Sequence, residues 1–219
     1  MDKIEENISK IKTLVAPYNP TIVAVTKYFG EEQIIRYYEL GLRDFGENRV
    51  KDALEKIEKL PDEIRQNSRF HLIGHLQTNK VKSAVGNFDL IHSVDSLHLA
   101  RAINEEAAKK GIVQKVLLQV NNAHEEQKFG FSPEELDESF KELLNLKSLR
   151  IEGLMNIAPL CEDSEKLRAL FKNIKQINDR LRFEWGVELN QISMGMSNDF
   201  LIALEEGATI IRLGRILFT

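Results

Sequence analysis

The stretch that decides the fold is Thr21-Ile22-Val23-Ala24-Val25-Thr26-Lys27, an apolar run that ends in a lysine and leads directly into a turn and a helix. A short run of this kind, rich in β-branched residues, is typical of a buried strand. In barrels of parallel strands and helices, the carboxyl ends of the strands carry the chemistry. A lysine there can hold a carbonyl compound as a Schiff base, so Lys27 is the first candidate functional residue.

The rest of the chain repeats this alternation of strand and helix. Strand-like segments are predicted at residues 21–26, 43–45, 70–73, 88–94, 113–120, 150–155, 189–193 and 209–213. Amphipathic patterns predict helices at residues 31–40, 47–60, 78–85, 96–110, 133–146, 161–182 and 197–206. A further helix, with an apolar stripe, precedes the first strand and contains Ile4, Ile8, Ile11 and Val15.

That order predicts an α/β fold, a single (β/α)8 TIM-type barrel with an extra N-terminal helix, formed by residues 1–219 as one domain. The predicted helices that follow strands are one fewer than the strands, and the leading helix would fill the resulting gap in the outer ring. A doubly wound open sheet is the alternative.

The composition indicates a compact soluble domain, because 42% of the 219 residues are hydrophobic and 29% are charged. A formal net charge of -4 argues against nucleic-acid binding through bulk electrostatics. The charged N-terminus lacks the apolar core of a signal peptide, and no segment approaches the roughly 18 apolar residues of a membrane span. The single cysteine, Cys161, cannot form an internal disulfide, so we expect a cytoplasmic protein.

Two segments at the ends of the last strands have the composition of a phosphate site. They are Ser193-Met194-Gly195-Met196-Ser197-Asn198-Asp199 and Arg212-Leu213-Gly214-Arg215. Loops after the seventh and eighth strands of such barrels bind phosphate, because glycines let backbone N–H groups approach the anion. A phosphate site opposite a strand-end lysine matches pyridoxal 5'-phosphate (PLP). We expect its aldehyde on the Nζ of Lys27 and its phosphate against Ser193, Gly195, Ser197 and the amides of Gly214 and Arg215.

Each of these features also has a purely structural explanation. A lysine at a strand end is most often a solvated surface charge, and the serine-glycine loop is also typical of a tight turn. A charge inside the last strand, Arg212, needs either a carboxylate partner or a ligand. Asn48 either faces the cofactor ring or starts a helix, and His71 is either a hydrogen-bonded core residue or an acid/base group. The spacing of His75, His92, His98 and His124 does not fit a metal cluster, so no metal is expected.

A set of short motifs resembles one known family. In order, they are Val25-Thr26-Lys27, Phe45-Gly46-Glu47-Asn48, the segment 71–80, His92-Ser93-Val94-Asp95, Lys128-Phe129-Gly130-Phe131, Gly153-Leu154-Met155, the segment 193–199 and Arg212-Leu213-Gly214. This pattern closely resembles the pyridoxal phosphate homeostasis protein family, whose domain looks like the N-terminal barrel of alanine racemase. The resemblance extends from about residue 23 to the C-terminus.

The resemblance implies PLP as cofactor, a Schiff base on Lys27, and a role in binding and supplying PLP, with PLP-dependent apoenzymes as partners. By similarity to the racemase, Arg212 would lie beside the pyridine nitrogen, where a cation weakens the electron sink of the ring. The racemase takes an acid/base group from a second domain of its partner subunit, for which this chain has no residues. We therefore expect a monomeric, non-catalytic binding protein.

The pattern departs from the family at two places near the expected site. Tyr28 and Phe29 follow the lysine where a small polar residue is typical, and Arg215 replaces a residue with a hydroxyl group. The backbone amide of residue 215 is still present with arginine at this position. A contact between the side chain of residue 215 and the phosphate is not implied by the resemblance. The alternatives are a racemase-like enzyme and a barrel that binds a sugar phosphate without a covalent bond.

Overall fold

The computed structural model describes residues 2–123, 125 and 129–218. His124 and Lys128, both named above, lie outside the described residues. The strands are β1 (Thr21–Val25), β2 (Asp44–Glu47), β3 (Arg69–Leu72), β4 (Leu90–Val94), β5 (Gln114–Gln119), β6 (Leu149–Met155), β7 (Gln191–Ser193) and β8 (Ile210–Leu213). They pair in chain order, all parallel, and close into a barrel. The predicted fold class is thereby confirmed.

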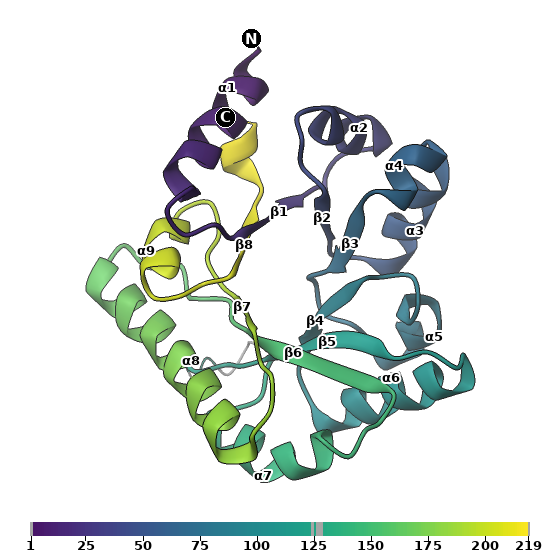
Figure 1. The fold of residues 1–219 in the computed structure, drawn as a ribbon, viewed down its shortest axis with the longest axis vertical. Helices are drawn as coiled ribbons and strands as arrows, with labels where there is room; N and C mark the ends of the chain where they lie inside the picture. The colour runs from purple at the N-terminus through teal and green to yellow at the C-terminus, as the bar shows by residue number, and fades with distance from the viewer. Residues whose placement is uncertain (1, 124, 126–128, 219) are drawn as a thin grey trace.

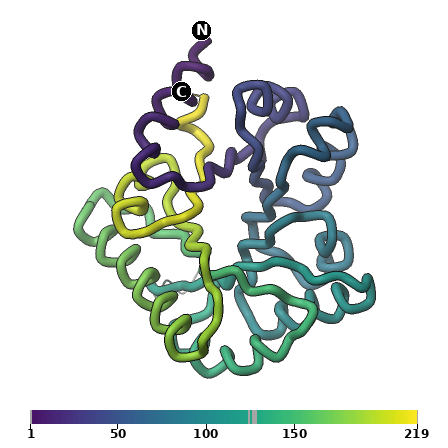
Figure 2. Tube along the Cα trace, viewed as in Figure 1, coloured from purple at the N-terminus to yellow at the C-terminus, as the bar shows by residue number. Residues whose placement is uncertain are grey.

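Helices surround the strands as an outer ring (Figure 1). They are α1 (Lys3–Val15), α2 (Glu31–Glu39), α3 (Val50–Lys59), α4 (Asp62–Gln66), α5 (Val81–Ala84), α6 (Leu97–Lys109), α7 (Pro133–Leu143), α8 (Ser164–Trp185) and α9 (Phe200–Glu205), with 3-10 turns η1 (Thr78–Lys80) and η2 (Arg215–Leu217). The predicted N-terminal helix is α1, which packs beside η2, so the two ends of the chain lie close together (Figure 2).

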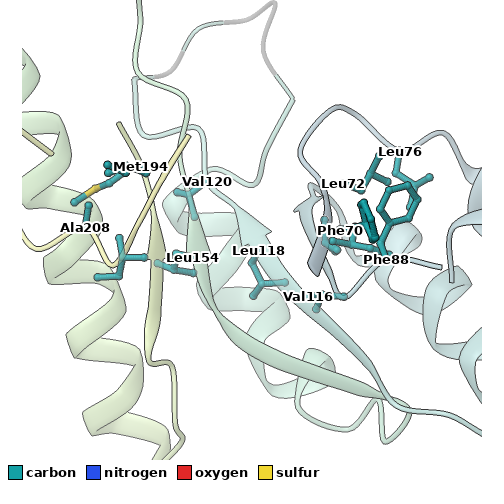
Figure 3. Packing of buried hydrophobic residues seen from close by; sticks show 14 of the residues in the cluster. Phe70, Leu72, Leu76, Phe88, Val116, Leu118, Val120, Leu154, Met194 and Ala208 are labelled. Carbon is teal, nitrogen blue, oxygen red and sulfur yellow. The ribbon is translucent and has the colours of Figure 1, made fainter. Parts of the chain in front are cut away.

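The strands separate two apolar layers, because successive side chains of a strand point to opposite sides. The larger layer lies between strands and helices and includes Leu118 and Leu154 of neighbouring strands (Figure 3). The smaller cluster fills the barrel interior and comprises Val23, Leu90, Leu117, Met155 and Ile210. This alternation assigns every other strand residue to one side of the barrel wall.

Some predicted element boundaries differ from those of the structure. Glu47, predicted to begin a helix, is the last residue of β2, where it pairs with Leu72 of β3. Helix α3 begins only at Val50, and the short α4 lies in a segment for which neither helix nor strand was predicted. Sheet pairing therefore overrides the local helical pattern at residue 47. Within the described residues, no helix is both long enough and apolar enough to cross a membrane.

Candidate functional site

Lys27 follows the end of β1 at the carboxyl end of the barrel. Its side chain is exposed, and its Nζ lies 4.9 Å from the centroid of the Tyr28 ring. The backbone forms a turn, in which the amide of Phe29 donates to the carbonyl of Thr26. The amine is therefore accessible to a ligand that enters from solvent.

Arg212 lies inside the barrel, on the same side of β8 as the interior residue Ile210. Only 4% of it is exposed. Its Nη1 donates to the Oγ of Ser193 over 2.7 Å, and its Nη2 donates to the backbone carbonyl of Asn156 over 2.7 Å. The guanidinium is thus fixed by the ends of two neighbouring strands, β6 and β7.

A chain of hydrogen bonds continues from Ser193 across the interior to the opposite rim. Ser193 Oγ lies 2.9 Å from His92 Nδ1, and His92 Nε2 lies 2.9 Å from His71 Nδ1. His71 Nε2 lies 3.0 Å from Asp44 Oδ1, and Arg69 donates twice to this carboxylate. Burial raises the pKa of Asp44, but the hydrogen bonds from Arg69 and His71 outweigh it and bring the pKa below its ordinary value.

The groups at the two ends of this series of hydrogen bonds determine which atom donates and which accepts in each bond. Asp44 as a carboxylate only accepts, so His71 Nε2 carries a proton. With a neutral His71, its Nδ1 accepts from His92 Nε2. A neutral His92 then accepts the Ser193 hydroxyl at Nδ1, while the Ser193 oxygen accepts from Arg212. This direction satisfies every partner in the chain, and His71 is a buried residue that is hydrogen-bonded at both ring nitrogens, one of its two predicted alternatives.

Burial also shapes the protonation of the two innermost basic groups. The pKa of Arg212 falls to about 10 because the side chain is desolvated, with the Asp199 carboxylate partly opposing this. Desolvation, reinforced by the positive charge of Arg212, holds the pKa of His92 well below its ordinary value. At neutral pH, the interior therefore holds a charged arginine beside a neutral histidine.

The loop between β7 and α9 and the start of η2 form a group of polar atoms. This group lies at the carboxyl end of the barrel, the end at which Lys27 lies. The amides of Gly214 and Ile216 both lie 3.4 Å from Ser197 Oγ, at the long limit of a hydrogen bond. Gly195 has a φ of +88°, and a Cβ there would come within 2.6 Å of the Ala203 Cβ. Only glycine allows the loop to approach α9 this closely. Backbone donors that converge on one point fit an anion such as phosphate.

The other predicted residues lie around the same edge of the barrel. Asn48 follows β2 and lines a hollow of about 480 Å³ with Gly74 and Lys80. A second hollow of about 570 Å³ lies nearby, where His75 bonds to Asp95. Arg215 is exposed at the first position of η2. Lys27 lines neither hollow, and the described residues contain no cluster of three or more histidine, cysteine or acidic side chains suited to a metal.

A second buried polar group lies on the outer side of the barrel wall, and sequence reasoning missed it. Lys56 of α3 reaches under the end of β1 and donates to Glu47 Oε1 over 2.6 Å and to the carbonyl of Thr26 over 2.9 Å. The Thr26 hydroxyl donates to the same carboxylate oxygen over 2.6 Å. The segment Phe45-Gly46-Glu47-Asn48, noted as a motif, was the available signal for Glu47. Nothing in the pattern of α3 distinguishes Lys56 from its solvated neighbours.

Comparison with known proteins places this barrel in a family. The family model described as the N-terminal domain of alanine racemase matches residues 1–219. The pyridoxal phosphate homeostasis protein of Aquifex aeolicus is 44% identical over 197 residues, which cover 90% of this chain and 85% of that protein. This chain belongs to the pyridoxal phosphate homeostasis protein family. The family predicted from the sequence motifs is therefore confirmed.

Other relatives extend over the whole chain. The homeostasis protein of Helicobacter pylori strain J99 is 36% identical and covers 99% of this chain and 96% of its own length. PipY of Synechococcus elongatus, solved with PLP bound, is 36% identical, with a TM-score of 0.90 over 99% of this chain and all of its own. Alanine racemase of Clostridium difficile is 21% identical, with a TM-score of 0.78 over all of this chain and 56% of its own, and shares the fold.

The neutral His92 predicts an acid-sensitive stability. Because its pKa is depressed in the folded state, the unfolded chain takes up a proton first, and stability falls as the pH drops below about 6.5. The loss approaches about 1.4 kcal/mol per pH unit well below this pH, until the folded-state pKa is reached. Urea unfolding across this range checks it. The His92→Gln variant should show a shallower slope, and the exposed His98→Gln should keep the wild-type slope. Equal slopes in all three proteins would contradict this role of His92.

Proposed function

We propose that this chain binds PLP as a Schiff base on Lys27, and that it holds and supplies the cofactor without catalysing a reaction of its own. The observation that carries the proposal is the arrangement at the seam of the barrel. Lys27 follows β1, and the paired strand β8 carries Arg212 and leads into Gly214. The relative PipY, solved with PLP bound, supports the choice of ligand.

The residues of the rim fit the parts of this ligand. The Nζ of Lys27 would form a C=N bond with the aldehyde carbon, with loss of one water molecule. The amides of Gly214 and Arg215, the loop at Gly195 and the Ser197 hydroxyl would hold the phosphate. The phosphate contact of Ser193 stays a prediction, since its hydroxyl bonds to Arg212 and His92.

Arg212 favours a protein that binds the cofactor without using it in catalysis. Bound PLP supplies an electron sink, whose strength depends on a proton at the pyridine nitrogen. Arg212, held by Ser193 and Asn156, would place a cation near that nitrogen and disfavour the proton. The side chain of Asn48 would face the ring. We further propose that the protein acts as a monomer in the cytoplasm and delivers PLP to apoenzymes that depend on it.

Trapping with borohydride tests the covalent bond. The protein is incubated with PLP, reduced, digested and analysed by mass spectrometry, and we expect the modified peptide to contain Lys27. If the protein is folded but carries no adduct at Lys27 after reduction, the proposal is wrong. Exchange of the α-hydrogen of amino acids in deuterium oxide tests the absence of catalysis, and rapid exchange would favour the racemase-like alternative.

A further inference from the structure

The backbone of Thr26, the residue that precedes Lys27, is held by three hydrogen bonds. The Thr26 amide donates to the Gly46 carbonyl of β2 over 3.0 Å. The Thr26 carbonyl accepts from the Phe29 amide over 3.0 Å and from Lys56 Nζ over 2.9 Å. The first two bonds are backbone bonds of the sheet and the turn. The bond from Lys56 is the one made by a side chain of a distant element, α3.

The side chain of Thr26 is held on the outer side of the barrel wall. It is completely buried, and its hydroxyl donates to Glu47, which also lies on the outer side of β2. Lys27 follows directly in the turn, so the anchored Thr26 fixes the backbone from which the Lys27 side chain departs.

Burial of the Lys56 and Glu47 side chains costs desolvation free energy. The exposed fractions of their side chains are 11% and 2%, and both groups are charged. A buried ion pair of this kind gives little net stability compared with an apolar pair of the same size. Its geometric effect is specific, because one ammonium group joins the helix, the carboxylate of β2 and the carbonyl that precedes Lys27.

We propose that Lys56 and Glu47 are positioning residues for the Schiff-base lysine. Lys56 holds the Thr26 carbonyl, Glu47 holds Lys56 and the Thr26 hydroxyl, and together they orient the backbone from which the Lys27 side chain departs. Their contribution is to bond formation between Nζ and the aldehyde, and not to recognition of phosphate or ring. This inference rests on the function proposed above.

A pair of ligands separates positioning from general damage. PLP carries the aldehyde, whereas 4-deoxypyridoxine 5'-phosphate has the same ring and phosphate with a methyl group in its place. In the Lys56→Met variant we expect PLP affinity to fall by about tenfold, because orientation of the reacting groups is lost. Affinity for the deoxy analogue should change by less than about twofold.

A second variant keeps the test decisive if Lys56→Met does not fold. The double variant Glu47→Met with Lys56→Met removes the bond to Thr26 without leaving an unpaired buried charge. It should show the same selective loss for PLP. Lys51→Met is the matched control, since Lys51 lies on the same helix with 80% of its side chain exposed, and it should bind both ligands as the wild type does.

The results distinguish the two proposals. If the double variant binds both ligands like the wild type, or loses affinity for both equally, Lys56 and Glu47 do not position Lys27. If the wild-type protein itself shows no preference for PLP over the analogue and no adduct, the covalent function of Lys27 fails. A wild type that forms the adduct, with a variant that selectively loses PLP, supports both.

Discussion

The Lys27→Ala variant is expected to fold like the wild type and to show no visible absorbance of a Schiff base with PLP. Lys27 is exposed, and its Nζ lies over the Tyr28 ring. Truncation of such a surface residue changes the free energy of unfolding by at most about 0.5 kcal/mol. The covalent bond is lost completely because alanine has no amine. Absorbance titration with PLP, followed by borohydride trapping, measures the effect.

Residual binding and a control lysine make this result specific. The backbone donors near Gly214 and the Ser197 hydroxyl remain in the variant, so PLP should still bind weakly and reversibly. The Lys51→Ala variant removes an exposed lysine of α3 and should keep the full absorbance. A Lys27→Ala protein that still forms the adduct with unchanged absorbance would assign the Schiff base to another lysine.

The Lys56→Met variant is expected to lose about 3–5 kcal/mol in free energy of unfolding, because it leaves the Glu47 carboxylate buried and unpaired. Glu47 is only 2% exposed, so water cannot replace the ammonium group. A loss of this size is a large part of the about 5–15 kcal/mol that stabilises a typical domain. Urea unfolding followed by circular dichroism measures it.

Two further proteins show whether charge is the cause. The double variant with methionine at both Glu47 and Lys56 should be clearly more stable than Lys56→Met, because no unpaired charge remains and only the Thr26 hydroxyl loses its acceptor, at a cost of about 1–3 kcal/mol. Lys51→Met should lie within about 0.5 kcal/mol of the wild type, since an exposed pair contributes little. If the double variant is as unstable as Lys56→Met, the loss in free energy of unfolding comes from packing around α3 and not from the unpaired Glu47 charge.

The architecture was predictable because its signals are local. The strands are covered on both faces, so several of them, such as β1, appear in the sequence as short apolar runs without strict alternation. Helix ends were also readable where capping residues mark them, as at Ser132, which forms a capping box with Glu135. The prediction was wrong at Glu47, because the pairing of this residue with Leu72 depends on a strand elsewhere in the chain.

The candidate site was predictable only where its residues are contiguous. Lys27 follows a strand and Gly195 lies in a compact loop, so each carries a signal within a few neighbouring positions. The interior chain joins His92 to Ser193, which are far apart in sequence, and its register exists only in the folded barrel. Lys56 looks like an ordinary helix lysine until α3 is placed beside β1. Such contacts follow from topology and not from local composition.

The pairing of β1 with β8 determines the stage of folding at which the proposed site can form. These strands come from opposite ends of the chain, and their pairing, Val23 with Arg212 among others, completes the barrel. Contacts between distant segments pay the largest loop-closure entropy and slow the folding of such topologies. Since Lys27 and Arg212 lie on the two sides of the seam between these strands, the proposed binding site would form only when the ring closes. A ligand that spans it would stabilise the closed barrel against opening at this joint.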